Sequence, residues 1–171
     1  MTVSDTGGAI VRQDDAPVLH AFGEEVIVHV DGERTEGKFT MWTEITPPGG
    51  GPPLHYHTKE DEAFHVIEGR VAFLVDGKWH ELGPGGAAFM PRGIVHTFKN
   101  VGDQPSRMLL ATMPSGFEKF FARCAAEFGE PDGPTCHRSS RPASRTEFIL
   151  CSRSAVSENA NEKPVSFGCA L

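Results

Sequence analysis

Short β-forming segments separated by turn residues recur between residues 24 and 113, and this spacing constrains the fold most. The segments lie at 24–30, 38–46, 62–69, 70–82, 94–100 and 106–113. Gly, Pro or Asp turns separate them about every ten residues, and Asp76-Gly77 is a dipeptide typical of a type I′ hairpin. No helical crossover fits between these segments. The pattern therefore predicts an all-β sandwich or barrel and disfavours a parallel α/β sheet.

One helix is predicted after the β segments, over residues 115–129 (SGFEKFFARCAAEFG). Ser115 and Glu118 have the spacing of a capping box, and Gly129 suits a helix end. Apolar side chains recur at helical spacing between these ends. We interpret the helix as a cover over an open side of the barrel, which gives one domain of residues 1–130.

Residues 131–171 differ in composition from the rest of the chain. They are rich in serine and contain few large apolar residues, and only TEFILCS within them resembles a strand. Such a segment buries too little apolar surface to offset the entropy of ordering its backbone. We expect a disordered or loosely packed tail.

Charge and composition limit the partners and the location that we expect. The formal net charge is −7, which argues against nucleic acid or an anionic membrane as partner. The N-terminus has no apolar stretch typical of a signal peptide, and no run approaches the ~18 apolar residues of a membrane span. The four cysteines form no CxxC pair, so we expect reduced thiols and a cytoplasmic protein.

A cluster of metal-ligand residue types stands out in the stretch GGGPPLHYHTKEDEAFHVIEG, residues 49–69. On an extended segment His55 and His57 point to the same side, and Glu62 opens the next strand. A third imidazole, His96, lies in MPRGIVHTFKN. Three imidazoles and one carboxylate suit a divalent first-row metal ion, with positions left open for substrate or dioxygen. Because ligand histidines must be neutral, metal occupancy should fall as the pH drops toward ~6.

Other titratable residues compete for this role or lie outside it. Glu60 and Asp61 are alternative carboxylates, although a loop favours solvated acids. His65 is an odd number of residues from Glu62 and should face away from the metal. The remaining histidines have no ligand-like neighbour in sequence and are interpreted as ordinary polar residues: His20, His29, His80 and His137.

The two histidine-containing stretches resemble the two motifs of the cupin superfamily. The first matches as Gly49, His55, His57, Glu62 and Gly69, and the second as Gly85, Pro91, Gly93, His96 and Asn100. The resemblance covers about residues 20–113. It implies a double-stranded β-helix of the jelly-roll type, with His55, His57, Glu62 and His96 as metal ligands. The metal itself is left open among iron, manganese, nickel, cobalt, copper and zinc.

Within that superfamily the chain looks most like single-domain cupins similar to quercetin dioxygenases. This resemblance implies a dioxygenase that binds a small enol, catechol or flavonol directly to the metal. Glu62 would be both ligand and general base, which requires a raised pKa. The pocket is expected to include Met41, Phe64, Phe98 and Met108. A non-oxidative isomerase, cyclase or lyase, and a metal- or small-molecule-binding protein without turnover, remain open alternatives. Cupins commonly pair through edge strands, so we expect a homodimer.

Overall fold

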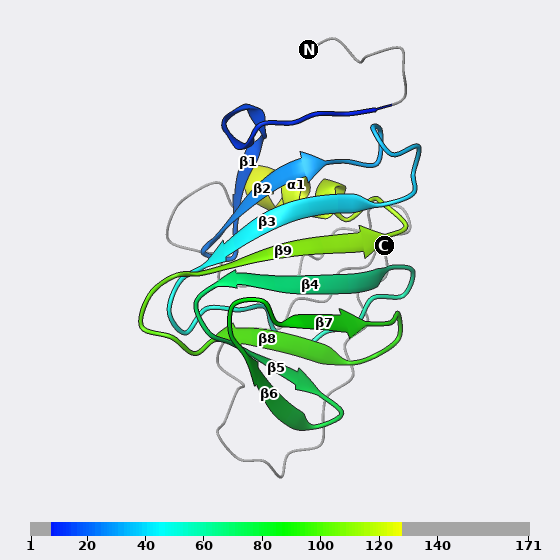
Figure 1. The fold of residues 1–171 in the computed structure, drawn as a ribbon. Coiled ribbons are helices and arrows are strands. Elements are labelled where there is room, and N and C mark those ends of the chain that lie inside the picture. The colour runs from blue at the N-terminus through cyan, green and yellow to red at the C-terminus, as the bar shows by residue number, and fades with distance from the viewer. Residues whose placement is uncertain (1–7, 128–171) are drawn as a thin grey trace.

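Two antiparallel sheets with a shared core make up most of the computed structural model, which describes residues 8–127 (Figure 1). The larger sheet has the order β1 (Val18–Ala21), β2 (Glu24–Val30), β3 (Thr40–Thr46), β9 (Ser106–Met113), β4 (Asp61–Glu68) and β7 (Ala87–Met90). The smaller sheet has the order β6 (Lys78–Leu82), β5 (Val71–Val75) and β8 (His96–Asn100). A short 3-10 helix, Gln13–Asp15, precedes β1, and α1 (Glu118–Glu127) follows β9. The predicted all-β fold with a C-terminal helix is confirmed. The expected tail lies outside the described residues.

Strict alternation along the central strands builds the core. Glu62, Phe64 and Val66 of β4 are buried, whereas His65 between them is exposed. Opposite residues of paired antiparallel strands share a face, so the register Phe64–Leu110–Trp42 places these three side chains in one row of the inner face. Burial of each such side chain stabilises the fold by about 1.5–3 kcal/mol. The inner face is therefore apolar at its centre and has Glu62 at one end.

The hairpins show where local sequence decides the structure and where it does not. Asp76 and Gly77 both adopt positive φ, 51° and 72°, as a type I′ turn requires, and they join β5 to β6 as predicted. Strand β7 was not predicted, because it has only four residues, two of them alanines, between Gly86 and Pro91. Its pairing with β4, Glu62 with Met90 and Phe64 with Ala88, makes it a strand.

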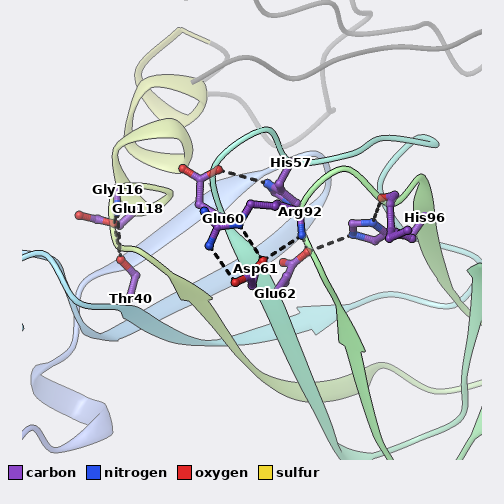
Figure 2. A network of polar contacts seen from close by, with 10 residues as sticks. Thr40, His57, Glu60, Asp61, Glu62, Arg92, His96, Gly116 and Glu118 are labelled. Atoms are coloured by element: carbon purple, nitrogen blue, oxygen red, sulfur yellow. Dashed lines mark hydrogen bonds and ion pairs between the residues drawn. The ribbon is translucent and has the colours of Figure 1, made fainter.

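Helix α1 begins later than its sequence predicts. The helix starts at Glu118 and not at Ser115, so the expected capping box does not form. The Glu118 carboxylate instead accepts hydrogen bonds from Gly116 N–H at 2.9 Å, from Gly32 N–H at 3.3 Å and from the hydroxyl of Thr40. Glu118 thus joins the start of the helix to β3 and to the loop before it (Figure 2). Within residues 8–127 no helix has the length and apolar content that a membrane crossing needs.

Aromatic packing fixes the helix against the larger sheet. Trp42 stacks on Phe117 with ring centroids 5.8 Å apart and meets the edge of Phe121 at 5.6 Å. Phe120 stacks on Phe22, which precedes β2. The helix thus packs against the larger sheet, and Phe117, just before α1, meets the edge of the His57 ring with centroids 4.8 Å apart.

Two buried carboxyl groups lie on the inner face away from that cluster. Glu24 and Glu44 are 4% and 3% exposed, their side chains are hydrogen-bonded to each other, and Trp42 Nε1 donates to Glu44 at 3.0 Å. Burial raises the pKa of Glu44, and the charge of Glu62 adds to this effect. The hydrogen bonds from Glu24 and Trp42 act in the opposite direction but are outweighed. The carboxyl group is therefore held in its neutral form above its usual titration range.

This raised pKa predicts a specific pH dependence of stability. A folded-state pKa above the unfolded value of about 4.5 means that the contribution of Glu44 is lost as the pH rises through the folded value. Glu44→Gln keeps an acceptor for Trp42 but cannot ionise. In urea unfolding of metal-free protein, the stability of this variant relative to wild type should therefore increase between pH 5 and pH 8. Glu81→Gln, on the exposed strand β6, is the control and should show no such change. A Glu44→Gln difference that is constant with pH would contradict this account.

Candidate metal centre

Four side chains from three separate segments converge at one end of the inner face. His55 and His57 lie on the connection from β3 to β4, Glu62 is the second residue of β4, and His96 is the first residue of β8. One ligand atom from each lies within 4.8 Å of all the others. His57, Glu62 and His96 are buried, and His55 is half-buried. The residues predicted as ligands are therefore close enough together to share one cation.

Backbone hydrogen bonds with β8 and with the turn before it hold the two histidines that lie outside any strand. His55 and His96 exchange both backbone hydrogen bonds, at 3.0 and 2.8 Å, and Gly93 N–H donates to the carbonyl of His57 at 2.7 Å. The predicted strand over His55 and His57 is thus reduced to isolated bridges. Their rings nevertheless lie on one side, with centroids 5.2 Å apart.

The hydrogen bonds of His96 test whether a cation fits. Its Nδ1 lies 2.9 Å from the carbonyl of Ile94, so Nδ1–H donates there, and its Nε2 lies 3.1 Å from Glu62 Oε2. In a neutral ring Nε2 carries a lone pair, which would then face a carboxylate oxygen. A cation between these atoms removes that repulsion. At metal–nitrogen lengths of ~2.1 Å, neighbouring ligand atoms at right angles lie about 3 Å apart, so the residues fit a divalent ion.

His55 repeats the arrangement of His96. Its Nδ1 lies 2.8 Å from the carbonyl of Pro53, which leaves Nε2 for the shared centre. Burial and the neighbouring His96 and His57 rings lower the pKa of His55 to about 4. The charge of Glu62 acts in the opposite direction but is outweighed. The ring is therefore neutral at physiological pH, as a metal ligand must be.

The electrostatics of Glu62 differ from the prediction. Burial favours a higher pKa, but hydrogen bonds with His57 and His96 and the charges of His57 and His55 outweigh it and lower the pKa of Glu62 to about 2. For His57, burial favours a lower pKa, and the hydrogen bond and charge of Glu62, with the charge of Glu60, raise it instead. The raised pKa that a strong general base requires is not found at Glu62. This carboxylate is ionised and suited to coordination.

The predicted pocket residues are distributed over both faces of the larger sheet and the inner face of the smaller one. Phe64, Phe98 and Met108 are buried in the core, with Phe64 and Phe98 edge to face at 5.9 Å. Met41 pairs with Ala111, which pairs with Ala63, so these three share the face opposite to Glu62. Met41 therefore cannot line a pocket at the centre. The sequence showed its alternation but not which face of β3 is internal.

The alternative carboxylates behave differently from each other. Asp61 forms an ion pair with Arg92, whose guanidinium donates at 2.8 and 2.9 Å, and this pairing lowers the pKa of Asp61 to about 2. Glu60 was expected to be solvated but is only 3% exposed, and its Oε2 lies 3.9 Å from Nδ1 of His57 (Figure 2). Neither belongs to the four-residue cluster.

The other histidines lie away from the cluster. His65 is exposed on the outer face of β4, as predicted. His20 and His80 are also exposed, and His29 Nε2 lies 2.7 Å from the hydroxyl of Thr43. His137 lies outside the described residues.

An apolar pocket not predicted from the sequence lies between β7 and the β5–β6 hairpin. Its volume is about 290 Å³, and it is lined by Phe73, Val75, His80, Leu82, Ala87, Ala88, Phe89 and Met90. None of the four candidate ligands lines this pocket, but Met90 is the strand partner of Glu62, and Val75 is the strand partner of His96. The place of the pocket depends on which strands form the sheet edges, and this does not follow from the sequence.

Comparison with known proteins agrees with this geometry. The Cupin domain family (Cupin_2) matches residues 42–112, which include all four residues of the cluster. The likeness to a cupin domain is thus a match over these residues. The matched stretch extends from β3 to β9 and includes strands of both sheets.

Two curated relatives come from streptomycetes. Polyketide synthase CurC of Streptomyces cyaneus is 34% identical over 74 residues, which cover 43% of this chain and 48% of CurC. Tetracenomycin polyketide synthase protein TcmJ of Streptomyces glaucescens is 33% identical over 67 residues, 39% of this chain and 45% of TcmJ. The chain therefore spans about half the length of these two relatives.

Solved structures share the fold at lower identity. The polyketide cyclase RemF from Streptomyces resistomycificus is 24% identical, with a TM-score of 0.55 over 63% of this chain and 80% of RemF. A predicted oxalate decarboxylase from Thermotoga maritima is 22% identical, with a TM-score of 0.57 over 62% of this chain and 99% of that one. At this identity the likeness concerns the cupin fold alone.

Proposed function

We propose that this protein is a metal-dependent enzyme that acts on a small, flat, enolisable aromatic compound of polyketide type. The single observation that carries the proposal is the convergence of His55, His57, Glu62 and His96 within 4.8 Å, in a fold that also holds an apolar pocket of about 290 Å³. A bound divalent cation would supply Lewis acidity, which lowers the pKa of an enol or phenol hydroxyl group.

The protein's own residues supply the ligand tautomers, the negative charge and the apolar surface that such a reaction needs. His55 and His96 are kept in the ligand tautomer by the carbonyls of Pro53 and Ile94. Glu62 contributes a negative charge that is present at any physiological pH, because its pKa is about 2. The pocket between β7 and the β5–β6 hairpin is lined mainly by apolar side chains, which suit an aromatic ring. Glu62 is therefore proposed first as a ligand and only second as a proton acceptor.

Non-oxidative cyclisation or isomerisation is the reaction class that we favour. CurC and TcmJ, which match this chain over 74 and 67 residues, are named as polyketide synthase proteins. Polyketide chains are rich in enolisable carbonyl groups. An ionised Glu62 with a low pKa fits polarisation and orientation of such a substrate better than strong-base catalysis.

Dioxygenase activity is the second candidate. The spacing of His55, His57 and Glu62, with His96, resembles quercetin dioxygenase-like cupins. Oxidoreductase OpS7 of Beauveria bassiana is 45% identical over 49 residues, which are 28% of this chain and 16% of OpS7. Protein loaded in turn with Mn²⁺, Fe²⁺, Co²⁺, Ni²⁺ and Zn²⁺ should be screened against polyketide-type phenols and flavonols with and without air. Turnover that persists without air supports the cyclase or isomerase; turnover that stops without air and consumes oxygen supports the dioxygenase. No turnover and no binding under either condition contradicts both.

A further inference from the structure

The second buried carboxylate of the site, Glu60, has no function in the coordination described so far. It lies between His57 and Glu62 in sequence, and only 3% of it is exposed. A buried carboxylate is costly unless a donor or an opposite charge faces it. Its Oε2 is buried and has no hydrogen-bond partner among residues 8–127.

His57 faces Glu60 and also has a buried polar atom without a hydrogen-bond partner among the described residues. Its Nδ1 is also buried and without a hydrogen-bond partner in the described part of the chain, and it lies 3.9 Å from Glu60 Oε2. Its other nitrogen, Nε2, lies 3.1 Å from Glu62 Oε2 at the shared centre. The two carboxylates therefore flank a single ring, one on each nitrogen (Figure 2).

Comparison with the other two histidines shows what is missing. His55 and His96 each place Nδ1 within 2.8–2.9 Å of a backbone carbonyl, Pro53 and Ile94 respectively. Metal-bound histidines almost always donate their second N–H to such an acceptor, which fixes the tautomer and the ring orientation. For His57 no carbonyl of residues 8–127 takes this position, and Glu60 is the carboxylate that faces it.

We propose that Glu60 is a positioning residue that accepts the Nδ1–H of His57 when a metal ion is bound at Nε2. The distance of 3.9 Å exceeds a hydrogen bond by about 1 Å, so a small rotation of either side chain closes it. The bond holds His57 in the ligand tautomer and places a full negative charge behind this ring, where the other two rings have only a carbonyl dipole. Glu60 touches neither metal nor substrate. This inference rests on the metal centre of the proposed function.

Metal affinity measured at one fixed pH tests the proposal. Wild-type protein, Glu60→Leu, Glu60→Gln and the neighbouring control Asp61→Asn should be titrated with Zn²⁺ against a competing chelator. We expect Glu60→Leu to bind about 10- to 100-fold more weakly, the range typical when an outer partner of a metal ligand is lost. Glu60→Gln, which keeps an acceptor oxygen, should lose less. Asp61→Asn should bind like wild type, because Asp61 pairs with Arg92.

Two further readouts separate positioning from a merely structural role. In the Zn²⁺-loaded wild-type protein, the Nδ1–H proton of His57 should be observed by NMR and protected from exchange, and in Glu60→Leu this protection should be lost. A substitution that merely loosened the fold would lower the urea midpoint of the metal-free protein without this selective loss of protection at His57.

The outcomes distinguish this inference from the proposed function. If wild type binds Zn²⁺ and both Glu60 variants bind it equally well with the His57 proton still protected, the positioning role is wrong and the proposed function stands. If Glu60→Leu does not fold, Glu60→Ala, which also lacks an acceptor, takes its place, and wild-type affinity with a protected His57 proton in that variant overturns the positioning role in the same way. If wild type binds no metal, both proposals fail.

Discussion

Replacing His96 with alanine should abolish metal binding. His96 is 1% exposed, bridges to His55 through two backbone hydrogen bonds and places Nε2 3.1 Å from Glu62. Its loss removes one of the four candidate ligands. We expect the affinity for Co²⁺ to fall by more than about 100-fold, since loss of an outer partner alone costs 10- to 100-fold.

The matched control is His65→Ala, three positions beyond Glu62 on the exposed side of the same strand. Calorimetric titration and elemental analysis after dialysis should show one ion per chain for wild type and for this control, and none for His96→Ala. A free Co²⁺ concentration 100 times the dissociation constant should also stabilise the control by about 2.7 kcal/mol. Retention of a full equivalent of metal by His96→Ala would place the ion elsewhere.

A single methyl group on Gly51 should disrupt the same site from a distance. Gly51 has φ of +146°, where side chains are strained, and an added Cβ would lie 2.1 Å from the carbonyl oxygen of Phe98 in β8. Strain of this kind costs about 1–3 kcal/mol, and the clash with backbone adds to it. The segment that carries His55 and His57 must then move away from β8. Gly51→Ala should therefore lose at least ~3 kcal/mol of stability and most of its metal affinity.

Gly83 provides the control for this substitution. It lies between β6 and β7, and a Cβ there would meet nothing within 4 Å. Gly83→Ala should leave both the urea midpoint and the affinity for Co²⁺ close to wild type. If Gly51→Ala is as stable as Gly83→Ala and binds metal equally well, the close approach of this connection to β8 is not what holds the histidines.

Local sequence was sufficient to predict the features that depend on a few neighbouring residues. The Asp76-Gly77 turn needs only two residues with positive φ, and β9 was predicted with its observed ends, 106–113. The four candidate ligands were found because their spacing matches the cupin motifs, although His55 and His57 lie on no strand. Here the motif identified the residues and the pairing with β8 supplied the geometry.

The features that were missed depend on contacts between residues far apart in the chain. The Glu118 carboxylate accepts hydrogen bonds from Thr40, 78 positions earlier, and from Gly116 N–H. The local capping box with Ser115 was therefore the wrong prediction. Glu60 is buried only because the fold brings the connection and β4 around it. Met41 lies on the outer face because β9 pairs with β3 in a particular register. None of these contacts is encoded within a short window of sequence.

X-ray absorption of wild-type protein reloaded with one equivalent of Co²⁺ tests the central claim most directly. The account predicts one ion per chain with three imidazole nitrogens and one carboxylate oxygen at about 2.0–2.2 Å. The imidazole signal should drop by one nitrogen in a variant of any ligand histidine that still binds. A spectrum without imidazole scattering, or unchanged by His55→Ala, His57→Ala and His96→Ala alike, would contradict it.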